Sequence, residues 1–318
     1  MCGIVGYIGK ENSSKIVLDG LKNLEYRGYD SWGIAVNHNG NLDSFKRVGE
    51  INIKKDSLPL PKTSSAIGHT RWATHGGVNK INAHPHFSTR RSFVLAQNGI
   101  VENYQDLKGK LIMKKYTFDT ETDTEVIVRL IEEKRKSNDT LRDSVRAAFN
   151  DLEGRNTVIV LDSGKDDHII AVRNGSPLVL GVGKDGIFLA SDALAFAKHT
   201  KDVVFLDNYD LVEIKGNEFE IYDAKTGIRK EYKVTTLNNK IKGISKGKYD
   251  HFMIKEIVEQ KDTVLRAADY KLDDFKPLIE AIKNANRVYI TGAGTAGFAS
   301  GQIAYYLRNI AKVDALDV

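Results

Sequence analysis

Cys2 is the residue with the clearest chemical potential, because it is the only cysteine of the chain and lies at its second position. A small residue there allows the initiator methionine to be removed, which would give Cys2 a free α-amine beside its thiol. The amine titrates near about 7.7–8.0 and an unperturbed thiol near about 8.5, so the amine can accept the thiol's proton at neutral pH. Cys2 is therefore a candidate nucleophile that carries its own base. The alternative is a small buried apolar residue, the commonest use of a lone cysteine.

Two charged residues downstream could hold an amino acid. Arg71 lies in the segment 69–75, at the end of a predicted strand, and its guanidinium could bind a carboxylate through two parallel hydrogen bonds. Asp123 lies in an acidic segment and could bind a cationic amine. Together they would grip the zwitterionic end of an amino acid. Singly, Arg71 could instead form a structural ion pair, and Asp123 could cap the helix that follows it.

Asn98 and Gly99 follow an apolar strand, and an Asn amide beside a Gly backbone N–H is a suitable donor pair for a tetrahedral oxyanion. A plain Asn-Gly turn is the alternative.

Four of the eight histidines lie between His69 and His86, a spacing that could bind zinc. The cluster contains no acidic residue or cysteine, so a metal hydrolase is the weaker interpretation.

The composition narrows the class of protein. The chain has 318 residues, of which 41% are apolar and 28% charged, as in folded domains, and its length suggests two of them. The net charge of +5 is spread along the chain, which gives no reason to expect nucleic acid. No apolar stretch reaches the roughly 18 residues of a membrane span. We expect a cytoplasmic protein with no membrane segment, in a reducing compartment that keeps the thiol active.

The expected elements change along the chain. Up to residue 152, strands alternate with helices, and a hairpin turn is expected at residues 38–41 because an Asn-Gly pair supplies the positive φ angles that it needs. Residues 157–215 contain short apolar runs separated by turn residues, which favours antiparallel sheets. Residues 235–249 are rich in lysine and glycine and are interpreted as a linker. Helices are then expected at 252–268, 274–284 and 298–310, with strands at 287–291 and from 313.

Six ordered motifs carry a family resemblance. They lie at residues 2–6, 24–31, 69–76, 82–86, 98–103 and 121–125. Together they closely resemble the glutaminase domain of the glutamine–fructose-6-phosphate aminotransferases. The resemblance implies an αββα N-terminal-nucleophile hydrolase sandwich over residues 1–235, a linker over 236–250, and the start of an α/β sugar-isomerase domain over 251–318.

The resemblance also implies the roles of individual residues. Cys2 matches the nucleophile, and Asn98 and Gly99 match the oxyanion hole. The glutamine pocket of the family corresponds to Arg71, Trp72, Thr74, His75 and Asp123. Arg27 and His84 match positions near the active-site loops. Gln97 stands where many relatives have histidine. This change is next to Asn98 and Gly99 and should leave their hydrogen-bond donors in place.

Residues 292–297 fit G-x-G-x-x-G between a predicted strand and helix, a pattern that also occurs in dinucleotide-binding folds. Read through the resemblance, this stretch is a sugar-phosphate loop to which Gly294 and Thr295 contribute. Ala296 replaces the serine that the family usually has there, and only Thr295 keeps a hydroxyl.

The resemblance implies hydrolysis of glutamine by Cys2 and transfer of the ammonia to fructose 6-phosphate, which gives glucosamine 6-phosphate. It implies no metal or organic cofactor, and a homodimer for the complete enzyme. Two alternatives stay open. The chain could be a glutaminase that works with a separate isomerase subunit, or a regulatory protein that binds glutamine without synthase activity.

Overall fold

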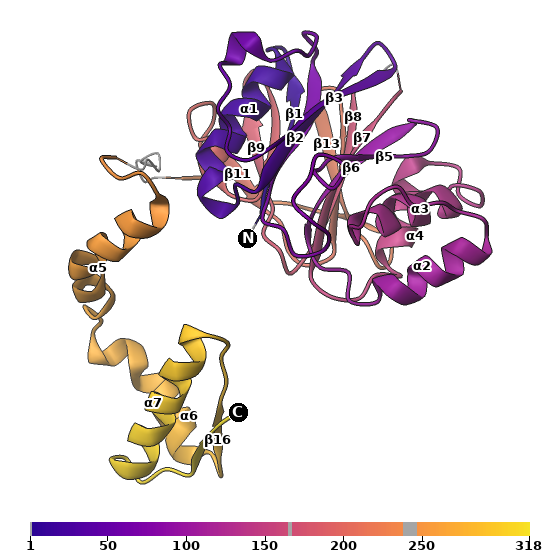
Figure 1. The fold of residues 1–318 in the computed structure, drawn as a ribbon. Coiled ribbons are helices and arrows are strands. Elements are labelled where there is room, and N and C mark those ends of the chain that lie inside the picture. Colours follow the sequence, from indigo (N-terminus) through magenta and orange to yellow (C-terminus); the bar gives the residue numbers. More distant parts are fainter. Residues whose placement is uncertain (1, 165–166, 238–246) are drawn as a thin grey trace. The chain divides into compact units, whose positions relative to one another are not determined.

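The computed structural model describes residues 2–164, 167–237 and 247–318, and Figure 1 shows its ribbon. The chain divides into two compact units, Met1–Ile244 and Ser245–Val318. Their boundary falls inside residues 236–250, the segment interpreted as a linker from its composition. Of that segment, residues 238–246 lie outside the described residues.

The first unit is built on two antiparallel sheets (Figure 1). The eight-stranded sheet has the order β15 (Thr235–Thr236), β11 (Asp202–Phe205), β9 (Val179–Gly183), β10 (Gly186–Ala190), β1 (Gly3–Gly9), β4 (Ser65–Arg71), β2 (Ser31–His38) and β3 (Asn41–Val48). The seven-stranded sheet has the order β14 (Arg229–Lys230), β13 (Glu218–Asp223), β12 (Asp210–Lys215), β8 (His168–Asn174), β7 (Asn156–Asp162), β6 (Phe93–Gly99) and β5 (His86–Phe87). Every strand pair in both sheets is antiparallel, as the short apolar runs predicted.

The two faces of strand β1 enter different layers of the core. Ile4 and Ile8 pack between the two sheets, whereas Val5 and Tyr7 pack on the other face, under helix α1 (Ser13–Leu24). Successive side chains of a strand point to opposite faces, so a strand that is apolar at every position is covered on both. The first sheet therefore lies between α1 and the second sheet.

Strand β6 shows the same alternation in the second sheet. Val94 and Ala96 pack between the sheets, and Phe93 and Leu95 pack against three helices: α2 (Tyr104–Met113), α3 (Thr124–Lys134) and α4 (Leu141–Phe149). The layers follow the order helix, sheet, sheet, helices, which Figure 1 shows. This is the αββα sandwich that the resemblance implied.

The second unit contains α5 (Phe252–Ala267), α6 (Lys276–Asn284), β16 (Val288–Ile290), α7 (Thr295–Asn309) and β17 (Ala315–Asp317). Strands β16 and β17 pair in parallel, and α7 connects them. This is the α/β pattern expected near the glycine-rich loop, but a full sugar-isomerase domain is not contained in this chain. None of the helices within the described ranges is long and apolar enough for a membrane crossing.

Candidate active site

Strand alternation brings the three principal site residues to one face. Ile4, Ile67 and Ala96 pack in the layer between the sheets. Side chains two or four positions away on an extended chain share that face. The side chains of Cys2, Arg71 and Asn98 therefore also lie between the two sheets, close to one another at one end of them.

The backbone carbonyl of Cys2 is fixed from two sides. It accepts a hydrogen bond from Arg27 Nε at 3.3 Å and one from Asn98 Nδ2 at 3.2 Å. The sulfur is fixed as well, because the backbone N–H of Trp72 donates to Cys2 Sγ at 3.2 Å. Contacts from three distant parts of the chain thus hold the residue predicted to be the nucleophile.

Burial of Cys2 determines the protonation state of its thiol. Burial raises the pKa of the thiol above its ordinary value, and the hydrogen bond from the Trp72 amide only partly opposes this effect. The thiol is therefore protonated at neutral pH. A reaction that begins with the thiolate needs a base close to the sulfur.

Asn98 and Gly99 are the last two residues of β6 and pair with Thr157 and Asn156 of β7. The alternative interpretation, a plain Asn-Gly turn, is therefore wrong. Gly99 has φ +129°, and an added Cβ would lie 1.9 Å from the carbonyl oxygen of Arg155. A glycine is required at this position, both by its backbone conformation and by the close approach of the neighbouring strand.

Arg71 holds the loop that follows β4. Its guanidinium donates to the carbonyl of Gly77 at 3.0 Å, to that of Gly76 at 3.2 Å and to that of His75. The ion pairs of the described residues include none with Arg71, so the alternative of a structural ion pair is wrong. The guanidinium lies at the cavity instead, with a side chain that is only 3% exposed.

The same loop is secured by a residue pair that the sequence reasoning missed. Glu121 accepts from the backbone N–H of Gly77 at 3.0 Å and from Asn82 Nδ2 at 2.7 Å. Asn82 Nδ2 also donates to the Gly77 carbonyl at 3.0 Å. Asn82 and Glu121 both lie in the six motifs, and this was the only sequence signal that pointed to them. The contact between them joins residues 39 positions apart, so no local pattern predicts it.

Asp123 lies just before α3, yet its side chain makes no capping bond, so that alternative is wrong. Its carboxylate accepts from the backbone N–H of Val101 at 2.8 Å. Burial raises the pKa of Asp123.

Trp72 is 45% exposed and stands edge-on to Tyr29, with ring centroids 5.9 Å apart.

Three histidines form a buried stack behind the nucleophile. The ring centroids of His69 and His84 are 4.2 Å apart, and those of His84 and His86 are 4.7 Å apart. His84 Nδ1 accepts from the Gln97 amide at 3.4 Å, and its Nε2 lies 3.1 Å from Thr124 Oγ1. Burial lowers the pKa of His69 to about 3 and that of His84 well below its ordinary value.

These contacts decide between the two uses of the histidine cluster. Both ring nitrogens of His84 have protein partners, and Nε2 of His69 lies 2.9 Å from the Gln97 carbonyl. Within the part of the chain that the structure describes, no three His, Cys, Asp or Glu side chains are grouped to hold a metal ion. The cluster is a neutral, hydrogen-bonded support for β6.

A cavity of about 20 Å³ lies where these elements meet. Such a volume has room for about one water molecule. Side chains at its mouth have to move before a molecule the size of an amino acid can enter. Of the predicted site residues, it is lined by Cys2, Arg71, Trp72, Thr74, His75, His84, Gly99 and Asp123.

Four predicted site residues do not line the cavity. Arg27 and Asn98 contact the Cys2 carbonyl instead. Gly294 and Thr295 belong to the second unit, where Gly294 precedes α7 with φ +60°.

Comparison with known proteins adds independent findings. Residues 69–198 match a family model described as a glutamine amidotransferase domain. The chain is 38% identical to the glutamine–fructose-6-phosphate aminotransferase (isomerizing) of Pyrococcus horikoshii, over 99% of this chain and 53% of the relative. It is 40% identical to the enzyme of that name from Bacteroides thetaiotaomicron, over 94% of this chain and 51% of the relative. The chain thus spans about half the length of these relatives.

Two solved structures resemble the fold. One is a glutamine phosphoribosylpyrophosphate amidotransferase from B. subtilis complexed with ADP and GMP, with a TM-score of 0.63 and 26% identity over 71% of this chain and 50% of that chain. The other is described as the allosteric regulatory enzyme of purine biosynthesis, with a TM-score of 0.64 and 27% identity over the same shares. With its antiparallel sandwich and its six motifs, this chain carries a glutamine amidotransferase domain and matches the N-terminal half of the glutamine–fructose-6-phosphate aminotransferases.

Proposed function

We propose that Cys2 is the nucleophile with which this chain hydrolyses the side-chain amide of glutamine. The observation that carries the proposal is the hydrogen bond of 3.2 Å from Asn98 Nδ2 to the Cys2 carbonyl. It places an amide donor beside the residue whose sulfur would attack. Asn98 and Gly99 would donate to the oxyanion that forms on the substrate carbonyl.

The base is the free α-amine of Cys2, exposed when Met1 is removed. The protonated thiol needs a base, and His69 is a poor one because its pKa is about 3. The amine takes the thiol proton while sulfur bonds to the amide carbon. The tetrahedral adduct collapses, the C–N bond breaks, and the proton passes to the departing ammonia. Water, deprotonated by the same amine, then cleaves the γ-glutamyl thioester and releases glutamate and the thiol.

The remaining residues of the cavity would bind the glutamine. Arg71 would receive the α-carboxylate and Asp123 the α-ammonium group, since both are buried charges at one cavity. Trp72, Thr74 and His75 would cover the substrate from the loop after β4. Arg27 and His84 would act indirectly, by positioning Cys2 and β6.

The synthase reaction belongs to the proposal as well. Relatives that carry the name glutamine–fructose-6-phosphate aminotransferase support fructose 6-phosphate as the acceptor of the ammonia and glucosamine 6-phosphate as the product. Residues 251–318 would begin the sugar-isomerase domain, with Gly294 and Thr295 in its phosphate loop. The complete enzyme would be a cytoplasmic homodimer.

We expect the 318-residue chain to release glutamate but to form no glucosamine 6-phosphate. Both products are measured on the purified chain supplied with glutamine and fructose 6-phosphate. Amino-sugar formation would contradict this expectation. Binding of glutamine without any glutamate release would favour a regulatory protein instead.

The mechanism is tested with one chain that retains an N-terminal tag and one whose tag is removed to expose Cys2. An amide nitrogen cannot accept the thiol proton, so the tagged chain should not hydrolyse glutamine although it is folded. Cys2→Ala should be equally inactive. Circular dichroism checks folding in all three proteins. Equal turnover with and without the tag would refute the N-terminal-nucleophile mechanism.

A further inference from the structure

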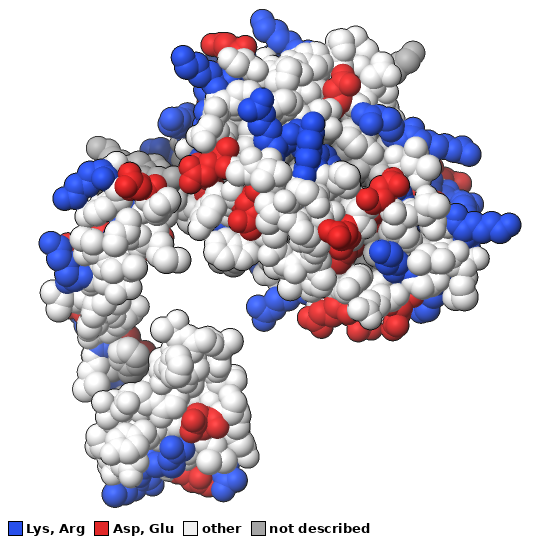
Figure 2. Space-filling view, viewed as in Figure 1, with Lys and Arg blue, Asp and Glu red and all other residues white. Residues whose placement is uncertain are grey.

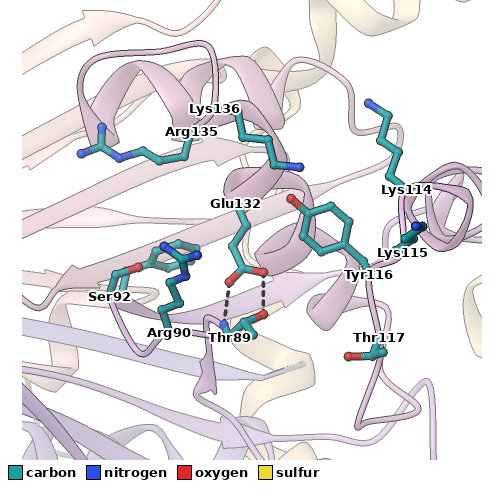
Figure 3. Close-up of a pocket in the computed structure, with 11 residues that line it drawn as sticks. Thr89, Arg90, Ser92, Lys114, Lys115, Tyr116, Thr117, Glu132, Arg135 and Lys136 are labelled. Atoms are coloured by element: carbon teal, nitrogen blue, oxygen red, sulfur yellow. Dashed lines mark hydrogen bonds between the residues drawn. The ribbon is translucent and has the colours of Figure 1, made fainter.

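A second, larger cavity lies in the first unit, with a volume of about 650 Å³ (Figure 3). Three segments form its walls: the turn between β5 and β6, the residues after α2, and the end of α3. Its lining shares no residue with the cavity at Cys2. The volume is within the range of sites for small molecules.

Cations predominate in this cavity. They come from all three walls, and they are Arg90, Lys114, Lys115, Arg135 and Lys136. One carboxylate, Glu132, is part of the lining. It accepts from the backbone N–H and the hydroxyl of Thr89 at 2.6 and 3.1 Å, as the dashed lines of Figure 3 show, and from Arg129 at 3.3 Å. Glu132 therefore stabilises the turn and α3 and forms an ion pair with none of these five cations.

The cations differ in how their charges are balanced. Lys114 and Lys136 share one carboxylate, that of Glu133, at 2.7 and 2.6 Å. Arg135 donates to the carbonyl of Asp139 at 2.8 Å, a neutral partner. Among the described residues, the side chains of Arg90 and Lys115 have no hydrogen-bond or ion-pair partner, although the backbone N–H of Lys115 donates to the Ile112 carbonyl.

A structural use accounts for only part of this charge. Cations near a helix C-terminus interact favourably with its dipole, and this explains basic residues after α2 and α3. Arg90 lies in a turn between strands, outside either helix. It has no structural partner in the described chain, yet it lines the same cavity.

The shape of the charge distribution indicates the kind of ligand. Arg90, Lys115 and Arg135 come from three different walls, and Figure 3 shows their side chains spread around the cavity rather than gathered at one point. Two linked phosphates would reach further than a single one, and guanidinium groups bind phosphate oxygens bidentately. Phe93 and the ring of Tyr116 add an apolar surface to the lining.

We propose that this cavity binds a diphosphate group, either free or as part of a nucleoside diphosphate. The phosphates lie among Arg90, Lys115 and Arg135. A nucleoside, where present, packs on Tyr116.

The test measures binding of inorganic pyrophosphate, ADP and adenosine to the 318-residue chain by isothermal titration calorimetry. The first variant is Arg90→Gln/Lys115→Gln. Glutamine keeps a side chain at Lys115, where φ is +67°, so this change adds no new backbone strain. The matched control is Lys54→Gln/Lys184→Gln, which removes two exposed cations outside the cavity and changes the net charge by the same amount.

Pyrophosphate and ADP should bind the parent chain and the control alike. The cavity variant should bind them about tenfold more weakly or worse, since charge-assisted hydrogen bonds are lost. ADP tighter than pyrophosphate identifies the nucleotide as the ligand form, and equal affinities identify the diphosphate alone. Glutamine hydrolysis should be unchanged in the variant, which shows that the fold is intact.

Three results would overturn the proposal. The first is absence of binding by both phosphates at millimolar concentration. The second is an equal loss of affinity in the control variant, which would indicate a nonspecific effect of net charge. The third is adenosine bound as tightly as ADP. Each result is independent of whether Cys2 is the nucleophile.

Discussion

At the scale of single residues, Arg71 shows how one side chain joins structure and function. In the substrate-free chain its guanidinium holds the carbonyls of His75, Gly76 and Gly77. Its proposed role is to bind a carboxylate in the same cavity. A guanidinium presents five donors in a fixed plane, so it can keep part of the loop while it accepts a new partner.

Arg71→Lys is therefore expected to raise the KM for glutamine about tenfold or more and to leave the protein folded. A lysine ammonium group cannot reproduce the planar pair of donors. Steady-state kinetics measure KM, and Arg47→Lys on the exposed strand β3 is the control.

A second substrate separates loss of the clamp from loosening of the loop. If Arg71 binds the α-carboxylate, glutamine analogues without that group should be poor substrates of the parent chain. The ratio of the KM values for the analogue and for glutamine should then be smaller in Arg71→Lys than in the parent. An unchanged KM for glutamine would contradict the assignment.

At the scale of elements, the end of β6 tolerates little change at Gly99. Gly99 has φ +129°, and its neighbour Arg155 would contact any Cβ. His69 and His84 hold this strand end through the backbone carbonyl and N–H of Gln97. The donors at Asn98 and Gly99 are rigid because strand pairing and the buried network fix them together.

Gly99→Ala is expected to destabilise the protein by about 2 kcal/mol or more, through positive-φ strain and the clash with the Arg155 carbonyl. Gly109→Ala in α2 is the matched control, because a Cβ there meets nothing within 4 Å. In a helix this control should stabilise the protein by up to about 1 kcal/mol. Urea unfolding of both variants measures the difference. Equal effects would show that Gly99 carries no strain.

At the scale of the whole molecule, stability depends on pH through the buried histidines. Burial lowers the pKa of His69 to about 3, and the pKa values of His84 and His86 are also well below normal. Below the unfolded pKa of about 6.5, the unfolded chain binds protons that the folded chain excludes. His168 acts in the opposite sense. Burial favours its neutral form, but hydrogen bonds to Asp162 and Glu213 outweigh this and raise its pKa.

The free energy of unfolding should therefore fall as the pH decreases from about 6.5 toward 4.5, by up to about 1.4 kcal/mol per pH unit for each buried neutral histidine. Urea unfolding across this range measures the slope. His38→Asn, which changes an exposed histidine, should leave the pH dependence of the free energy of unfolding unaltered. His69→Asn should make that pH dependence weaker. A slope of zero would mean that the stack is protonated in the folded protein.

The surface of the molecule adds little to these arguments. Figure 2 shows basic and acidic side chains interspersed over the visible face. This agrees with the modest net charge of +5. The charge at the 650 Å³ cavity is a local feature that the composition does not indicate.

The sequence by itself predicted the candidate chemistry and most of the strands. Cys2, the Asn98-Gly99 pair and the six motifs are read directly from residue types, and the continuous apolar runs of β1 and β6 predict strands. Strand β13 was missed, although Phe219 and Ile221 alternate with Glu218 and Glu220 in the pattern of a half-buried strand.

Only the tertiary structure decided what Arg71 and Asp123 contact in the absence of substrate. Arg71 binds three carbonyls rather than a carboxylate, and Asp123 accepts from Val101 rather than capping α3. The Cys2 carbonyl meets partners that are 25 and 96 residues away. Such contacts leave no periodic pattern in the sequence, because they depend on how two sheets and their loops pack rather than on the local conformation of any one segment.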